Sequence, residues 1–174
     1  MKALRKWAMF LLEQPLRALG LYLYEYPKPD CTATVVVLFN AGARVLVITR
    51  KHEPFQGKRA LPGGFLEVGK EKLRRTARRE LREETGLDFA EQRFVFVDER
   101  SDAHRDPRGH IVDHGWMVVV AESETSAVLA QLHADDDADD AAVIEVSELR
   151  RQGMAFDHLQ LLEAALAKAG VIAS

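Results

Sequence analysis

Disulfides and membrane spans are both missing from this sequence. It has one cysteine, Cys31, which cannot form an intramolecular disulfide, and this excludes a small disulfide-stapled secreted domain. A membrane-spanning helix needs roughly 20 apolar residues, and no run approaches that length, since the apolar residues 7–12 end at Glu13. No small-x-small cleavage site follows them, as a signal peptide would require. We therefore expect a cytoplasmic protein.

An excess of charge of one sign is missing as well. The chain has 24 Lys and Arg against 27 Asp and Glu, a net charge of −3. Composition therefore gives no reason to expect nucleic acid or an acidic membrane surface as a partner. The 174 residues contain no internal repeat, and they suffice for one domain with a substantial core.

Apolar segments separated by turn residues predict a mixed β-sheet with helices on both faces, an α/β (α+β) fold. We expect strands at residues 32–39, 44–50, 94–98, 116–121 and 143–146. Residues 51–64, 101–110 and 123–140 are predicted to be loops or linkers. Ser147 and Asp157 are predicted N-caps, the second for a final helix over residues 159–168 that Gly170 closes.

Residues 1–30 are predicted to be a helical extension ahead of the main domain, residues 31–174. The extension carries apolar side chains that need a surface to pack on. These are Leu4, Trp7, Leu11 and Tyr22. Packing on a second subunit would make the protein a homodimer, and the alternative is that the segment folds back on its own domain.

An acidic helix that ends at Gly86 is the most informative segment. At about 100° per residue, Glu80 and Glu84 lie on the stripe of Thr76 and Ala77, with Glu83 beside it. Like charges four residues apart repel, and an unpaired buried carboxylate is costly. A divalent cation such as Mg²⁺, which prefers oxygen ligands, would relieve both costs. The alternative is a solvated face held by ion pairs one turn apart.

The sequence around this helix resembles the Nudix box, Gly-x5-Glu-x7-Arg-Glu-U-x-Glu-Glu-x-Gly-U, where U is apolar. The matching residues are Leu-Pro-Gly-Gly-Phe-Leu-Glu at 61–67, Glu71, and Arg-Glu-Leu-Arg-Glu-Glu-Thr-Gly-Leu at 79–87. The spacing departs from the motif before Glu71. Gly64 matches the first glycine only if one residue, for example Lys70, is inserted between them.

The resemblance implies a Nudix-type α/β/α sandwich that hydrolyses a nucleoside diphosphate linked to another group, with Mg²⁺ or Mn²⁺ as cofactor. Glu80, Glu83 and Glu84 are the candidate metal ligands, and the resemblance adds the backbone carbonyl of Gly64. It also implies that Arg79 orients the glutamates through charge-assisted hydrogen bonds. A bound metal would neutralise the pyrophosphate and lower the pKa of bound water.

The general base that takes a proton from this water has two candidate origins. One is Glu83 on the acidic helix, and the other is an acidic loop residue, Asp139 or Asp140. In related enzymes a glutamate that acts on the water often follows an Asp-Asp-Ala-Ala run, and here Val143 stands at that position. This departure favours Glu83, while the alternative for residues 135–140 is a solvated acidic loop.

Segments outside the box resemble the ADP-ribose pyrophosphatase-like branch of the family. They are residues 50–58, 105–109, 139–142 and 155–158. Basic side chains in them are candidates for binding substrate phosphate or ribose, namely Arg50, His52, Arg105 and Arg108. Phe55 is a candidate for stacking on a base. Plain surface charges, an ordinary turn at residues 105–109 and core packing of the aromatic ring are the alternatives.

The resemblance predicts a Nudix pyrophosphohydrolase for a small nucleotide, with ADP-ribose split into AMP and ribose 5-phosphate. One alternative is a nucleoside-triphosphate pyrophosphatase that removes unwanted nucleotides. Another is a non-catalytic Nudix-fold ligand sensor. Sensors of this branch carry an added DNA-binding domain, and fewer than 20 residues follow the Phe-Asp-His run that ends at His158. We therefore expect an enzyme.

Overall fold

The computed structural model describes residues 11, 15, 16, 28–132 and 141–170, and its strands form one seven-stranded mixed sheet. The strands are β1 (Asp30–Phe39), β2 (Arg44–Thr49), β3 (Arg59–Ala60), β4 (Gly63–Phe65), β5 (Val95–Arg100), β6 (Ile111–Val119) and β7 (Ala141–Glu145). Their order is β3-β2-β1-β6-β5, with β4 paired to β1 and β7 paired to β2. The helices are α2 (Leu73–Thr85), α3 (Glu122–Leu132), α4 (Val146–Gln152) and α5 (His158–Lys168), with short 3-10 turns η1 (Asn40–Gly42) and η2 (Glu91–Arg93).

Strand β1 lies at the centre of the sheet because its side chains are apolar on both faces. The strand pairs antiparallel with β2 and β4 and parallel with β6. Every residue from Ala33 to Phe39 is buried, as expected for a strand that is covered on both sides. The combination of parallel and antiparallel neighbours confirms the predicted mixed sheet.

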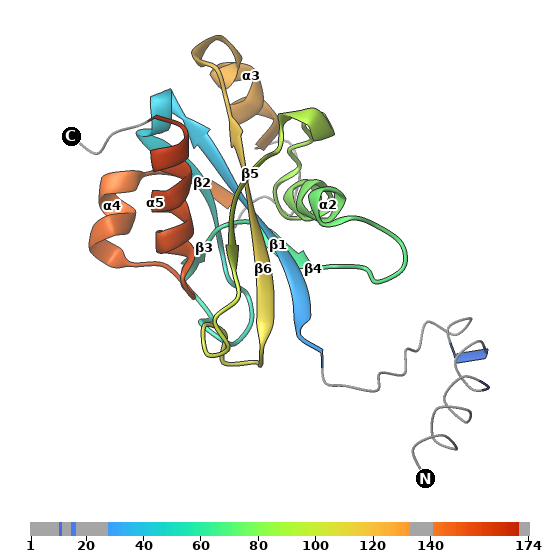
Figure 1. Cartoon of the computed structure of the whole chain (residues 1–174). Helices are drawn as coiled ribbons and strands as arrows, with labels where there is room; N and C mark the ends of the chain where they lie inside the picture. The colour runs from blue at the N-terminus through green and yellow to red at the C-terminus, as the bar shows by residue number, and fades with distance from the viewer. Residues whose placement is uncertain (1–10, 12–14, 17–27, 133–140, 171–174) are drawn as a thin grey trace.

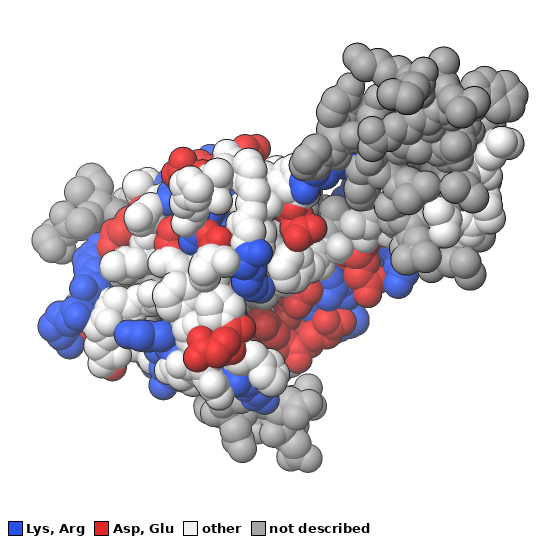
Figure 2. Space-filling model, turned by 90° about the horizontal axis from the view of Figure 1, so that it is seen from below, with Lys and Arg blue, Asp and Glu red and all other residues white. Residues whose placement is uncertain are grey.

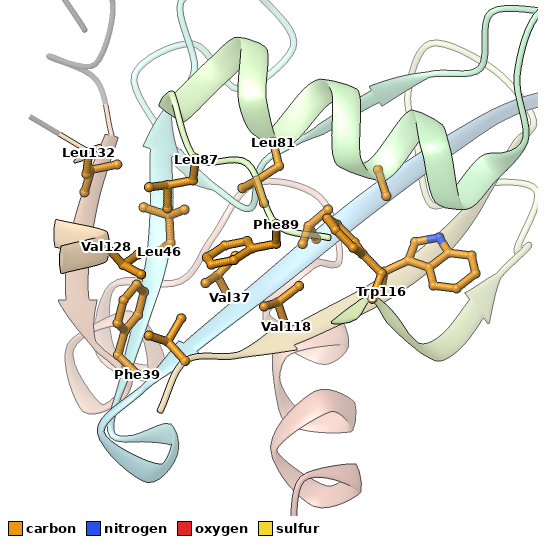
Figure 3. Packing of buried hydrophobic residues seen from close by; sticks show 14 of the residues in the cluster. Val37, Phe39, Leu46, Leu81, Leu87, Phe89, Trp116, Val118, Val128 and Leu132 are labelled. Atoms are coloured by element: carbon orange, nitrogen blue, oxygen red, sulfur yellow. The ribbon is translucent and has the colours of Figure 1, made fainter. Parts of the chain in front are cut away.

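Two hydrophobic cores flank the sheet, and successive residues of β1 enter opposite cores. Val35, Val37 and Phe39 pack beneath α2 and α3, and Figure 3 shows several of their partners in this core. Val36 and Leu38 pack against the apolar side chains of α4 and α5. Helices therefore cover both faces, as Figure 1 shows, and the predicted α/β/α sandwich is confirmed.

Most of the predicted strands are confirmed, but the polar segments were partly misjudged. Strand β6 begins at Ile111, earlier than predicted, and residues 51–64 contain β3 and part of β4. The predicted linker over residues 123–140 was wrong at its start, where α3 forms. Val128 and Leu132 are buried one turn apart, so a weakly apolar helix face was hidden among Ser, Thr and Glu residues.

Of the two predicted N-caps, Asp157 is confirmed in position and Ser147 is wrong. Helix α4 begins at Val146 with Glu145 at the N-cap position, so Ser147 lies inside the helix. Asp157 does occupy the N-cap of α5, but its side chain makes no capping hydrogen bond. Its carboxylate accepts hydrogen bonds from Arg100 and Arg105 instead, because these guanidiniums are stronger donors than a backbone amide.

The N-terminal extension lies largely outside the described residues, so its helix and the homodimer stay predictions. Among those residues Leu11 is exposed. Across the part of the chain that the structure describes, no helix combines the length and the apolar character that crossing a membrane requires.

Close packing of α5 on β6 yields a stability prediction. A Cβ atom at Gly115 would overlap Cδ1 of Leu161, which is fully buried. We expect Gly115→Val to lower the free energy of unfolding by about 1–3 kcal/mol, the usual cost of overpacking a core. Urea denaturation measures this loss. The exposed Val119→Ala on the same strand is the control and should change stability by no more than about 0.5 kcal/mol. Equal effects of the two changes would contradict the packing argument.

Candidate active site

Helix α2 carries the predicted acidic residues and packs on the central strands. Its buried face is formed by Thr76, Ala77, Leu81 and Thr85. The helix ends at Gly86, which has a left-handed φ of 74° and donates its N–H to the carbonyl of Arg82. Glycine reaches this conformation without steric cost, so the predicted helix and its stop are both confirmed.

The glycines before α2 let the backbone lie directly against the glutamates. Strand β4 pairs with β1 at Gly63 and Gly64. A Cβ atom at Gly64 would overlap the carboxyl group of Glu80, so any larger residue here would displace this carboxylate. Gly64 therefore faces Glu80, and in the following loop the N–H of Lys70 closes a turn onto the carbonyl of Glu67. The position of the inserted residue stays a prediction.

Arg79 connects three carboxylates and the preceding loop. Its Nη1 donates to Glu80 at 2.7 Å and to Glu83 at 3.0 Å. Its Nη2 donates to Glu71 at 2.8 Å and to the carbonyl of Phe65 at 3.0 Å. These are the contacts that an orienting residue needs. Burial alone would raise the pKa of Glu71, but the hydrogen bonds from Arg79 prevail and hold it below its usual value.

Glu84 is the most weakly compensated carboxylate of the group. It accepts a hydrogen bond from the N–H of Gly63 at 2.9 Å. Among the described residues it forms no ion pair. Burial raises its pKa to about 7, against the lowering effect of that hydrogen bond. Burial also raises the pKa of Glu80. The charge of Arg50 lowers the pKa of Glu84 only in part. A buried carboxylate that no ion pair holds is costly, so the site favours a further positive ligand.

The donor chemistry of this region fits a divalent cation. Glu80, Glu83, Glu84 and the carbonyl of Gly64 all offer the hard oxygen atoms that Mg²⁺ and Mn²⁺ accept. Glu83 is 52% exposed, and both it and Glu80 turn to Arg79. Within the described residues no three acidic, histidine or cysteine side chains are already gathered as a metal cluster. The predicted ligands thus share one region without forming a closed cage.

Two hollows meet at Glu84 and Arg50, which line both. One, of about 350 Å³, also has Thr49, Lys51, His52 and Glu83 on its walls. The other is a cleft of about 170 Å³ between β1, β4 and the loops at residues 105–108 and 156–158. Its polar lining includes Thr32, Thr34, Arg105, Asp106, Arg108, Asp113 and His158. The structure therefore brings the four predicted basic residues beside the glutamates.

The residues predicted to bind substrate differ in the contacts that they already make within the protein. Arg105 is only 6% exposed and forms a two-pronged ion pair with Asp157, at 2.6 and 2.9 Å. Arg105 still belongs to the lining of the cleft, and its role in substrate binding stays a prediction. Arg108 pairs with Asp106 at 2.7 Å. Phe55 lies outside the lining of the cleft but packs edge to face on Phe156, with ring centroids 4.8 Å apart.

Sequence reasoning missed several residues of the cleft. Asp113 is 1% exposed and accepts hydrogen bonds from the hydroxyls of Thr32 and Thr34, each at 2.8 Å. His158 accepts the N–H of Leu61 at its Nδ1 atom, and burial lowers its pKa to about 4, so it is neutral. Polar residues inside otherwise apolar strands were the available signal, but their partners come from distant segments.

The predicted loop bases, Asp139 and Asp140, lie outside the described residues, so that role stays a prediction. Val143, where related enzymes often have a glutamate, pairs with Leu46 on β2 and packs against the core beneath α2. Its apolar side chain is thus explained by packing, and it offers no base.

The charged surface shows no broad field of one sign on the face drawn in Figure 2. Acidic and basic side chains are interspersed there, as expected from a net charge of −3. Local groups of charged residues, such as those that line the cleft, therefore indicate function better than the overall electrostatic potential does.

The fold, together with the acidic helix and the glycines of β4 beside it, defines the class of this domain. The chain belongs to the Nudix family, because the family model of the NUDIX domain matches residues 29–165. The match spans the sheet, the acidic helix and most of α5.

Comparison with individual proteins places this chain near two relatives of different function. It is 37% identical over 120 residues, 69% of this chain and 64% of the relative, to the ADP-ribose pyrophosphatase of Methanocaldococcus jannaschii. It is 29% identical over 149 residues to the ADPR responsive transcriptional repressor NtrR of Acinetobacter baylyi, covering 83% of this chain and 56% of the repressor. The matched segments thus span less than two thirds of either curated relative.

A solved structure has the same fold. It is a bifunctional NMN adenylyltransferase/ADP ribose pyrophosphatase of Francisella tularensis in complex with AMP and a Mn ion. The TM-score is 0.67 at 26% sequence identity, and the match covers 94% of this chain and 48% of that one.

The raised pKa of Glu84 predicts how the stability of the metal-free protein depends on pH. The folded value of about 7 exceeds the ordinary 4.5, so the folded state binds more protons than the unfolded state between these values. Stability should therefore fall as pH rises through that window. Glu84→Gln keeps an acceptor for the Gly63 N–H and removes the charge. We expect this variant to be more stable than the parent at pH 8, with a smaller difference at pH 5.

Urea denaturation of metal-free protein at the two pH values measures the effect. The control is Glu122→Gln, an exposed glutamate at the start of α3, which should show no such pH-dependent gain. A Glu84→Gln variant that is less stable than the parent at pH 8 would contradict the burial argument.

Proposed function

We propose that this protein is a metal-dependent Nudix pyrophosphohydrolase that splits ADP-ribose into AMP and ribose 5-phosphate. The relative with 37% identity is an ADP-ribose pyrophosphatase, which supports the substrate. The observation that carries the proposal is the position of Glu84, which lies beside Gly63 and borders both hollows together with Arg50. A phosphate held by the arginine would lie next to the acidic helix.

Different residues of this chain would bind the diphosphate, hold the metal ion and orient its ligands. Arg50 and Arg108 would bind the negative charge of the diphosphate, because guanidinium groups match phosphate oxygens in geometry and charge. Glu80, Glu83, Glu84 and the carbonyl of Gly64 would hold Mg²⁺ or Mn²⁺. When bound, such an ion neutralises the phosphates and lowers the pKa of water. Arg79 would keep the glutamates oriented throughout.

A ligand sensor is the second candidate, because the chain also resembles a transcriptional repressor that responds to ADPR. The retained helix glutamates and their contacts with Arg79 favour catalysis over sensing. A nucleoside-triphosphate pyrophosphatase has no specific support in the cleft, but it belongs in the same substrate test. The three candidates share one fold. They differ in whether a substrate is hydrolysed and in which nucleotide that substrate is.

The enzyme proposal predicts hydrolysis that depends on a divalent ion. We expect ADP-ribose turnover to disappear in excess EDTA and to return with Mg²⁺ or Mn²⁺, because the carboxylates supply metal ligands rather than a complete catalytic site. Release of phosphate after treatment of the products with a phosphatase measures turnover, and a panel of nucleoside triphosphates is assayed in parallel. Glu84→Gln should lower kcat by orders of magnitude. Undiminished turnover in EDTA would exclude the metal mechanism, and tight ADP-ribose binding without turnover would identify a sensor.

The choice of general base gives a further prediction. We expect Glu83→Gln to reduce kcat by the ~10²–10⁴-fold that follows loss of acid–base catalysis. Asp139→Asn and Asp140→Asn should be nearly silent. Because Glu83 is also a candidate metal ligand, the Mg²⁺ concentration giving half-maximal rate is measured for each variant. A large kcat loss at saturating Mg²⁺ assigns a base, whereas a shifted Mg²⁺ requirement alone assigns a ligand. A thousandfold loss in either loop variant would transfer the role to the loop.

A further inference from the structure

Two aromatic residues at the edge of the cleft have backbone conformations that non-glycine residues rarely adopt. Phe156 has φ of 51° and Phe55 has φ of 65°. Such left-handed conformations are strained for side chains with a Cβ, and they persist where surrounding contacts enforce them. The two rings come from segments far apart in the sequence and meet edge to face. A strained backbone at a residue that lines the cleft suggests a functional role for the ring of Phe156.

Two positive charges lie against the ring of Phe156. The Cζ atom of Arg50 is 4.8 Å from the ring centroid, and that of Arg108 is 5.2 Å from it. Arg108 also lies 5.0 Å from the ring of Phe65. Guanidinium groups repel one another, but the negative face of an aromatic ring attracts each of them. The shared ring therefore allows two like charges to border one cleft.

The hydrogen bonds of both arginines leave one terminal nitrogen of each guanidinium for a ligand. Arg50 donates through Nε to the carbonyl of Pro54 and through Nη2 to that of His52. Arg108 donates through Nε and Nη2 to the buried carboxylate of Asp106. The bonds found among the described residues use neither Nη1 atom. Burial, and then the charge of Arg108, lower the pKa of Arg50, as expected where positive charge is concentrated.

The segment that carries Phe156 is anchored on both sides of the ring. Ala155 donates its N–H to the carbonyl of Arg59. Asp157 binds Arg105, and His158 accepts the N–H of Leu61. These three contacts with other segments of the chain hold the ring in place. The guanidiniums of Arg50 and Arg108 therefore lie against a ring whose own segment is fixed by contacts on both sides.

We propose that Phe156 is a positioning residue that holds Arg50 and Arg108 as a two-arginine clamp for the diphosphate of the substrate. The diphosphate as ligand rests on the function proposed above, whereas the clamp itself rests on the geometry of the ring. A diphosphate suits the clamp because its two adjacent anionic groups can meet one guanidinium each.

Binding of inorganic pyrophosphate tests the clamp without requiring catalysis. Isothermal titration calorimetry in metal-free buffer compares the parent protein with Phe156→Leu, Phe156→Asn and Phe156→Tyr. Asn tolerates a left-handed backbone, so it removes the ring without adding strain. We expect the Leu and Asn variants to bind pyrophosphate about tenfold more weakly, as loss of two cation–π contacts implies. Tyr should bind within about twofold of the parent, because it keeps the ring face.

The matched control is Phe96→Leu on β5, a similarly packed and partly exposed ring that contacts His114 and Trp116. It should leave pyrophosphate affinity unchanged, and melting temperatures report the folding of each variant. A double-mutant cycle with Arg108→Gln separates positioning from a general structural effect. We expect the losses from Phe156→Leu and Arg108→Gln to be clearly less than additive, because the ring acts through the arginine.

The outcomes for the clamp and for the proposed activity are distinguishable. If ADP-ribose is hydrolysed, Phe156→Leu should raise KM about as much as it weakens pyrophosphate binding, with a smaller change in kcat. Weakened pyrophosphate binding in a protein without ADP-ribose turnover supports the clamp and rejects the proposed function. Affinity equal to that of the parent in the Leu and Asn variants, additive losses in the cycle, or no pyrophosphate binding by the parent would each overturn the clamp.

Discussion

The ion pairs of Arg79 are the interaction on which the candidate active site depends. Helix α2 concentrates glutamates near its C-terminal end, where the helix dipole already disfavours negative charge. One guanidinium offsets this by binding Glu71, Glu80 and Glu83 together and by tying the helix to the carbonyl of Phe65. Side chains of these partners are partly shielded from water, so the attraction is screened less than at an open surface. Without this residue the carboxylates would repel one another.

The cleft is built around this helix by elements from opposite ends of the chain. Strand β1 contributes buried residues to the lining, and the segment before α5 contributes an aromatic ring. Strand β4 brings its glycine backbone against Glu80. The parallel pairing of β1 with β6 places Thr32 beside Asp113, so the lining of the cleft includes a buried hydrogen-bond network. The lining of the cleft therefore combines Glu84 of the acidic helix with the guanidiniums of Arg50 and Arg108, an arrangement that would suit a phosphate together with a metal ion.

Local patterns were sufficient to predict several elements, and non-local partners explain the failures. The apolar run of β1, the turn to β2 and the acidic helix with its stop at Gly86 follow from periodicity and glycine chemistry within a few residues. Helix α3 was missed because its buried side chains, Val128 and Leu132, are few. The start of β6 was missed because Asp113 interrupts an apolar pattern, and only the hydroxyls from β1 make its burial tolerable.

The sequence by itself determined the helical spacing of Glu80, Glu83 and Glu84 and the position of the stop that follows them, because both depend on a 3.6-residue period and one glycine. Only the tertiary structure decided which basic residues remain available to a ligand. It buries Arg105 in its pair with Asp157, whereas Arg108 stays partly exposed beside its partner Asp106 and lies with Arg50 against Phe156. That outcome depends on how α5 packs against the sheet and brings the residues just before it to the cleft. Contacts between such distant segments leave no periodic signal in the chain.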